Sequence, residues 1–464
     1  MKKILKIALS LIVVLLIGYF IYSKYQNTTV LKNVVHENAE SVLKIGLHDI
    51  KKTIILDAIS SPKYYWNSVN FKQGYKEKDT IDEPGKGIDF LPYSLVFYTM
   101  KNVKNTLFTT FPIKNSSEFE VYAQKFTTDK NIKIIKGDYS YAIDEKSKMV
   151  YAWNSSYLAV AISPKIDYKN YKLIFDDVLL KNKLISDSDN TYLDKLATSK
   201  NHITYLNGDG ELAINFLDGK AVVEGSLFTE NSNSFNSEIK YRALPNASLQ
   251  LYFDANLTNE AHRILTLKQL EGITFFEKNN IDVATLLSKT NGVFNLAIKG
   301  RTTQKDTIVT YEYDDNFNKI AIKSVQENQA PIITMNLGAK NSLYHYLSEQ
   351  KAIDNNVLKA IPLYTFYAHE TANTINFSTV KKALPSEQKT SGYFFSLNTN
   401  FSDLQQDIQF PKASKAASLL DKLRINAQQL NTNEIYIEGK LTATNDDINI
   451  ISQLYFGLKE KDSI

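Results

Sequence analysis

The first strong pattern along the chain is an apolar run near its start. Three lysines lie among the first six residues, and sixteen uncharged residues follow them, IALSLIVVLLIGYFIY, at positions 7–22. Counted from residue 4, this run would extend roughly 28 Å as a helix, at about 1.5 Å per residue, close to the ~30 Å core of a bilayer. The pattern predicts a cytoplasmic tip and a transmembrane signal anchor within residues 1–23, with residues 4–22 in the lipid bilayer.

A cleavable signal peptide and a buried helix of a soluble protein stay open as alternatives for this run. The run is longer than the apolar core of most signal peptides, and no small-x-small cleavage site follows Gly18. The N-terminal lysines outnumber Lys24 and Lys32 on the other side, which predicts an N-terminus in the cytoplasm. We therefore expect a single-pass protein of the cytoplasmic (inner) membrane with its body in the periplasm.

Beyond residue 40, short apolar runs separated by turn residues predict strands and hairpins. Tyr93–Met100 and Thr106–Ile113 flank a polar pentapeptide, and four runs between residues 132 and 163 predict a β-meander. Asp218-Gly219, between two β-rich runs, is the most specific turn signal in the chain. It predicts a type I′ hairpin, which needs a positive φ at both central residues.

Helical patterns are fewer than strand patterns. Asn115 followed by Glu118 resembles a capping box, and the next apolar residues recur at helical spacing, which predicts an amphipathic helix packed on a sheet. Other helices are predicted near 341–350 and 413–430. The chain is expected to close with a hairpin of two strands, at 435–442 and 448–457.

A polar segment at residues 229–237, rich in Asn and Ser, divides the body into two parts. We expect a juxtamembrane linker at 24–40, an α+β domain at 41–235, and a second α+β domain at 236–464, either separate from the first or continuous with it. The predicted fold class is α+β, with an N-terminal transmembrane helix followed by mainly antiparallel sheets, as meanders and hairpins, and packed amphipathic helices.

The amino-acid composition excludes several classes of protein and of functional site. With 43% hydrophobic and 12% aromatic residues, the chain is too apolar for a disordered protein. Its formal charge is +4, and three of its lysines lie before residue 23, so the body has no electrostatic reason to bind nucleic acid. The absence of cysteine excludes disulfides, thiolate metal sites, cysteine nucleophiles and lipid attachment to a cysteine.

No motif for catalysis or cofactor binding is complete. His369-Glu370 begins like H-E-x-x-H, but Asn373 stands where the second histidine is needed. Gly208–Ala213 has the letters of a dinucleotide-binding loop, yet strand-like residues follow it where that loop needs a helix. We therefore predict no catalytic residue, no cofactor and no metal site.

The composition departs from the ordinary in its high aromatic content, with 28 Tyr, 24 Phe and 2 Trp. Tyr64, Tyr65 and Trp66 follow directly after Pro62 and Lys63. Because Tyr and Trp combine apolar area with a polar tip, this cluster is a candidate ligand-binding surface. Packing inside the core is the ordinary alternative for such a cluster.

Three segments carry a family resemblance: LAINFLDGKAVVEGSLF at 212–228, ASLQLYFDANL at 247–257 and NGVFNLAIKG at 291–300. In this order they resemble an uncharacterised family of bacterial envelope proteins, which face the periplasm and are membrane-anchored or lipidated. The resemblance covers the middle part of the chain and includes no catalytic motif. It implies an extracytoplasmic setting and no particular activity, and the chain differs from lipidated members because it has no cysteine.

Together these patterns predict a membrane-tethered extracytoplasmic protein that serves as a non-enzymatic binding or assembly factor of the bacterial envelope, with an envelope protein as a candidate partner. One alternative is a hydrolase of envelope polymers, whose acidic residues would come together only in the fold. Another is a carrier or sensor of a lipid or glycan, which requires an apolar cavity or an aromatic platform.

Overall fold

The structure is a computed structural model that forms two compact units, divided between Phe216 and Leu217. This division comes earlier in the chain than the predicted boundary near 235. The described residues are 26, 29–66, 86–89, 93–186, 190–229, 235–236, 238–313, 317, 319–340, 342–359, 361, 363–382, 384–408 and 414–457.

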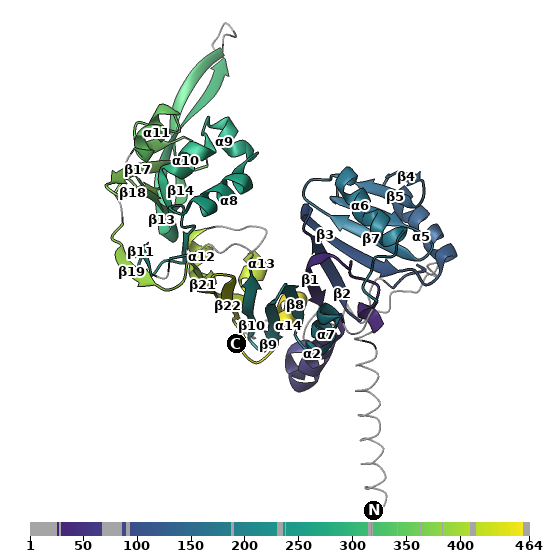
Figure 1. The fold of residues 1–464 in the computed structure, drawn as a ribbon. Helices are drawn as coiled ribbons and strands as arrows, with labels where there is room; N and C mark the ends of the chain where they lie inside the picture. The colour runs from purple at the N-terminus through teal and green to yellow at the C-terminus, as the bar shows by residue number, and fades with distance from the viewer. Residues whose placement is uncertain are drawn as a thin grey trace, which may run out of the picture. The chain divides into compact units, whose positions relative to one another are not determined.

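The first unit is built on one antiparallel sheet (Figure 1). Its strands are paired in the order β4-β5-β6-β7-β3-β2-β1-β8-β9. Their bounds are β1 Ala39–Ile45, β2 Leu95–Met100, β3 Val103–Pro112, β4 Ile134–Lys136, β5 Ser140–Asp144, β6 Met149–Trp153, β7 Tyr157–Ile162, β8 Ile203–Asn207 and β9 Gly210–Leu217. The predicted β-meander between residues 132 and 163 is confirmed as β4 to β7.

Helices pack on both faces of this sheet. Helix α5 (Ser116–Asp129) packs on one face and α6 (Tyr168–Leu179) on the other. The other helices of the unit are α2 Leu47–Ser60, α3 Pro62–Trp66 and α7 Thr191–Thr198. In strand β7, Leu158 and Val160 belong to the cluster of α5, whereas Ala159 and Ala161 belong to the cluster of α6. Because successive residues of a strand point to opposite faces, β7 is buried on both sides.

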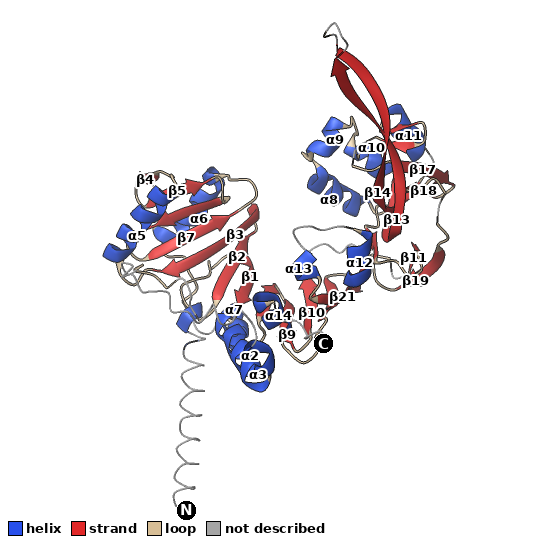
Figure 2. Ribbon diagram, turned by 180° about the vertical axis from the view of Figure 1, so that it is seen from behind, coloured by secondary structure: helices blue, strands red, loops and turns tan. Residues whose placement is uncertain are grey.

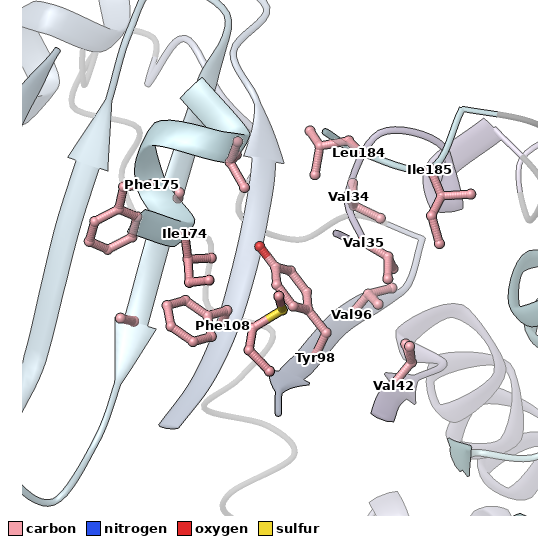
Figure 3. Packing of buried hydrophobic residues seen from close by; sticks show 14 of the residues in the cluster. Val34, Val35, Val42, Val96, Tyr98, Phe108, Ile174, Phe175, Leu184 and Ile185 are labelled. Carbon is pink, nitrogen blue, oxygen red and sulfur yellow. The ribbon is translucent and has the colours of Figure 1, made fainter. Parts of the chain in front are cut away.

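The larger core of the first unit surrounds Phe108 (Figure 3). Its ring lies 6.3 Å from the ring of Phe175 on α6, edge to face, and stacks on Tyr98 at 5.8 Å. The predicted cap of α5 is confirmed, since the Asn115 side chain accepts a hydrogen bond from the backbone N–H of Glu118.

The second unit contains a longer antiparallel sheet, paired in the order β10-β22-β21-β20-β12-β13-β14-β18-β17-β16-β15. The strand bounds are β10 Lys220–Phe228, β12 Leu249–Asp254, β13 Thr290–Tyr313, β14 Lys319–Ala339, β15 Ile353–Asp354, β16 Val357–Leu358, β17 Phe366–Thr371, β18 Thr374–Ser378, β20 Phe395–Asn400, β21 Leu420–Asn431 and β22 Glu434–Ala443. A separate pair of strands, β11 (Ile239–Ala243) and β19 (Glu387–Ser391), forms a small second sheet.

Helices of the second unit cover the apolar face of β13, β14 and β18 (Figure 2). Leu343 and Leu347 of α11 pack there with Ile375 and Phe377 of β18. The helices are α8 Glu260–Leu270, α9 Thr274–Lys278, α10 Val283–Ser288, α11 Leu343–Glu349, α12 Phe401–Asp407, α13 Ser414–Ala417 and α14 Ile450–Phe456.

The predicted fold class is corrected by this architecture. The structure is predominantly antiparallel sheet, with 44% strand against 27% helix. No helix in the described part of the chain is long and apolar enough to cross a membrane. The longest, α2 and α5, have 14 residues each and extend about 21 Å, short of the ~30 Å of a bilayer core. Residues 4–22, where the membrane anchor was predicted, lie outside the described residues.

Three local predictions are also wrong. Residues 420–431 form strand β21 rather than a helix, because pairing with β20 and β22 on both sides outweighs their helix propensity. Residues 450–456 form helix α14, capped by Asn449, rather than a closing strand. The turn at Asp218-Gly219 is not type I′, since only Gly219 has a positive φ, of 62°.

Candidate ligand-binding site

The aromatic cluster predicted from the sequence lies in α3 and is engaged within the first unit. Tyr65 is 1% exposed, and its hydroxyl donates a hydrogen bond to the buried carboxylate of Asp57. Tyr64 is half-buried, and the Lys63 ammonium lies 4.6 Å from the centre of its ring. Trp66 ends α3, and its side chain lies outside the described residues. The structure thus places the Tyr65 ring in the core.

A different set of residues comes together on the second unit's sheet. His369 on β17 stands directly opposite Asn376 on β18, which stands opposite Asn336 on β14, which stands opposite Asn295 on β13. Residues directly opposite each other in antiparallel strands point to the same face, with Cβ atoms about 4.5–5.5 Å apart. Four polar side chains therefore form a row across four strands.

This row continues across five more strands. Its next members are Tyr252 on β12, Ser396 on β20, Asn426 on β21, Glu438 on β22 and Glu224 on β10. Eight steps between neighbouring strands, at about 4.8 Å each, give a length of roughly 38 Å. We call these nine residues the polar row.

The opposite face of the same strands is apolar. Leu296 of β13, Met335 and Leu337 of β14, and Ile375 of β18 alternate with the members of the polar row. The last three of these side chains pack in the cluster that contains α11. The polar row thus occupies the face of the sheet that this cluster does not cover.

Strands β11 and β19, which we call the strap, lie over the middle of the polar row. The Tyr241 ring of β11 stacks on Tyr252 with ring centres 4.0 Å apart. The Tyr252 hydroxyl donates to Ser391 of β19, and burial raises the pKa of both tyrosines. Ile239 of β11 is 2% exposed within the same cluster. The strap is therefore a packed part of the fold.

A cavity of about 130 Å³ lies between the strap and one end of the polar row. Four members of the row line it, together with other residues of the floor and the strap: Asn295, Asn336, His369, Asn376, Gln250, Thr334, Arg242, Leu244 and Ser386. An adjoining cavity of about 320 Å³ shares five of the same lining residues, namely Arg242, Asn295, Asn336, Thr371 and Thr374.

Four residues that line the smaller cavity each have a buried side-chain atom without a hydrogen-bond partner: Gln250 Nε2, Asn295 Oδ1, His369 Nε2 and Asn376 Oδ1. The orientation of two of these amides is fixed by their other atom. Gln250 Oε1 accepts from the Leu244 N–H at 3.0 Å, and Asn376 Nδ2 donates to Asn336 Oδ1 at 2.8 Å. The amide nitrogen of Gln250 and the amide oxygen of Asn376 are therefore the atoms that have no partner among the described residues.

The energetic cost of this arrangement is large. A buried polar atom without a partner costs about 1–3 kcal/mol, so four of them would cost roughly 4–12 kcal/mol. The whole stability of a folded domain is only about 5–15 kcal/mol. Polar molecules bound at the cavity would offset this cost by completing these hydrogen bonds.

The far end of the polar row has a different chemistry. Glu438 accepts hydrogen bonds from Asn426 at 2.9 Å and Tyr393 at 3.0 Å, and these bonds lower the pKa of its carboxyl group. Glu224, directly opposite, accepts from the Tyr436 hydroxyl at 2.9 Å. A carboxylate held ionised is not suited to donate a proton, so Glu438 would not supply the acid of the hydrolase alternative. No group of three His, Cys, Asp or Glu residues that could hold a metal occurs among the described residues.

Sequence reasoning missed this site. His369 was considered only as part of a metal motif, and the asparagines were not considered. The signal in the sequence was asparagine inside strand patterns, as in Thr334-Met-Asn336 and Thr374-Ile-Asn376, because asparagine is depleted in strands. The register that aligns them could not be read from the sequence.

Comparison with known proteins adds little to this geometry. No family model matches the chain, and no curated protein matches it. Two solved structures of TP0453 are similar to part of it. Crystal form IV has 8% identity and a TM-score of 0.20 over 74% of this chain and 87% of that one. Crystal form III has 9% identity and a TM-score of 0.21 over 74% and 90%. Similarity at this level carries no argument about fold or function.

Proposed function

We propose that the protein is a non-enzymatic binding protein whose second unit holds a neutral, hydroxyl-rich ligand of the carbohydrate class. One observation carries the proposal: four buried polar atoms without partners belong to residues that line a single cavity at one end of the polar row. This function is among the non-enzymatic binding functions expected from the sequence, and it favours the glycan ligand that the sequence left as an alternative.

The chemistry of the free atoms suits hydroxyl groups. Gln250 Nε2 is a donor, Asn295 Oδ1 and Asn376 Oδ1 are acceptors, and His369 Nε2 takes either role according to its tautomer. A hydroxyl group donates and accepts at once, so a sugar bearing several hydroxyls can satisfy both kinds of atom. The orphan atoms are amides and an imidazole, so no buried charge is present among them to compensate an ionic ligand.

The size of the site is also suitable. The smaller cavity has room for about four water molecules at ~30 Å³ each, and the adjoining cavity of about 320 Å³ lies in the usual range for ligand pockets. Arg242 is exposed at the rim shared by both cavities, where it donates to Ser386 at 3.4 Å. A sugar ring, with about twelve heavy atoms, needs more space than four water molecules, so a sugar in the larger cavity would reach the smaller one with individual hydroxyl groups.

The proposal is tested by saturation-transfer NMR and calorimetry of the full chain with neutral oligosaccharides of glucose, mannose and N-acetylglucosamine, and with an acidic oligogalacturonate for comparison. We expect a neutral sugar to bind, and His369→Ala to weaken this binding. The matched control is Asn398→Ala, because Asn398 is exposed on the same face and does not line the smaller cavity.

Two results would overturn the proposal. One is the absence of binding to every neutral sugar, which would leave water as the only occupant of the cavity. The other is sugar binding that is equally insensitive to His369→Ala and Asn398→Ala, which would place the sugar elsewhere on the protein.

A further inference from the structure

Strands β13 and β14 continue beyond the second unit's sheet as a two-stranded arm (Figures 1 and 2). Near the sheet, β13 pairs with β12 over Val293–Ile298, and β14 pairs with β18 over Thr334–Gly338. From Lys305–Glu327 outward to Tyr313–Lys319, the two strands pair only with each other among the described residues. We call this part of the ribbon the arm.

The arm exposes apolar side chains along its length. Val309, Tyr311, Ile320 and Val325 are 42%, 56%, 48% and 65% exposed. An isolated two-stranded ribbon is marginally stable in water, and stable sheets usually have three or more strands. A long strand edge without a partner can also pair with other strands. Both arguments indicate that the arm has a strand partner.

We propose that this partner is the arm of a second copy of the same chain, with β14 antiparallel to β14 and a two-fold axis at Val325. In this register Val325 stands opposite itself, and Lys323 stands opposite Glu327 of the second copy, twice by symmetry. Opposite charges directly across an antiparallel pair are stabilising. The sequence of the strand is thus complementary to itself.

The symmetry of this contact limits the number of chains in the assembly to two. A two-fold contact uses the same surface on both copies, so it closes as a dimer. The two arms together form a four-stranded sheet, which meets the usual requirement for an independently stable sheet. The outer strands of that sheet are the two β13 strands.

The absence of cysteine allows a direct test of the register. Val325→Cys introduces the only thiol of the chain, and directly opposite Cβ atoms about 4.5–5.5 Å apart come close to the distance a disulfide needs. Ile320→Cys is the matched control on the same strand. In the proposed register Ile320 stands opposite Ala330, so the two cysteines at position 320 would be roughly 33 Å apart, ten residues at about 3.3 Å.

With diamide as oxidant, we expect full-length Val325→Cys to form a disulfide-linked dimer and Ile320→Cys to remain a monomer on non-reducing gels. Equal dimer yields from the two variants, or no dimer from Val325→Cys, would overturn the proposed register.

Sedimentation velocity tests the charge pairs without a thiol. Lys323→Glu places two carboxylates opposite each other in both symmetric pairs, and we expect dimerisation to weaken roughly tenfold. The double variant Lys323→Glu, Glu327→Lys reverses both charges and should restore association to within about threefold of wild type. The double variant also removes the exposed ion pair between Lys305 and Glu327, which is 3.1 Å long and of small energetic weight. A wild-type chain that stays monomeric at all concentrations, or a double variant no tighter than the single one, would overturn the proposal.

Discussion

Replacement of Asn295 by leucine is expected to change ligand affinity and protein stability in different ways. Asn295 is 4% exposed, its Oδ1 has no partner, and none of its side-chain atoms forms a hydrogen bond recorded in the structure. Leucine has a similar size and no polar atoms. The substitution therefore removes a buried unsatisfied acceptor and loses no known bond.

We expect the ligand-free protein to become more stable by about 1–3 kcal/mol, the cost of one buried unpaired polar group. For a unit of this size, each kcal/mol raises the melting temperature by roughly 2–4 °C. Binding should weaken by about tenfold or more, because a ligand hydroxyl placed against the introduced leucine loses its acceptor and is desolvated. Stability and affinity thus change in opposite directions.

The assay pairs urea unfolding of the ligand-free chain with calorimetric titration of the sugar found to bind. Asn398→Leu is the control on the same face; it removes the 3.0 Å hydrogen bond from Asn398 to Ser396 and should lower stability by about 1 kcal/mol or less, in contrast to the gain expected for Asn295→Leu. A loss of stability above about 1 kcal/mol in Asn295→Leu would refute the reasoning, because it would mean that Asn295 makes contacts that support the fold. Unchanged sugar affinity would remove Asn295 from the site.

Three further predictions concern stability. Asn115→Ala removes the cap of α5 and should cost about 1 kcal/mol in urea unfolding, whereas an unchanged midpoint would mean that the cap is dispensable. Gly219→Ala should cost about 1–3 kcal/mol or more, because φ is 62° and a Cβ would lie 2.4 Å from Asp446 Oδ1; full native stability would contradict this. Burial lowers the pKa of His36 and His202 below 6.5, although Asp177 acts in the opposite direction on His36. The unfolded chain therefore binds more protons below about pH 6.5, and stability should fall as the pH drops from there toward the folded pKa values. His36→Gln should reduce this dependence, and a urea midpoint that rises on acidification would show the sign to be wrong.

Some helices and hairpins could be predicted because the residues that determine them lie within a few positions of one another in the sequence. Asn115 and Glu118 are three residues apart, and β4 to β7 follow one another through short turns. The segment 420–431 could not be predicted in this way. Its leucine, lysine and glutamine residues favour a helix, and only pairing with two distant strands makes it β21.

The polar row could not be predicted for the same reason. Each of its members is a single polar residue in a strand, and the row exists only through register. Glu224 and Glu438 are brought together by the pairing of β10 with β22, although 213 residues lie between them in the sequence. A register shift of one residue in either strand would turn its member of the row to the opposite face.

The two faces of these strands also show why the polar row points to function rather than to stability. On β13, β14 and β18, the residues that alternate with the row are leucine, methionine, isoleucine and phenylalanine, and those of β14 and β18 pack in the cluster of α11. The chain therefore can bury apolar residues at these strand positions, and doing so at the row positions of β13 and β18 would remove two unpaired polar atoms, Asn295 Oδ1 and Asn376 Oδ1. With apolar residues there, the free energy of unfolding would increase by the cost of leaving those polar atoms unpaired. A polar face kept at such a cost is expected where its groups are required by a ligand.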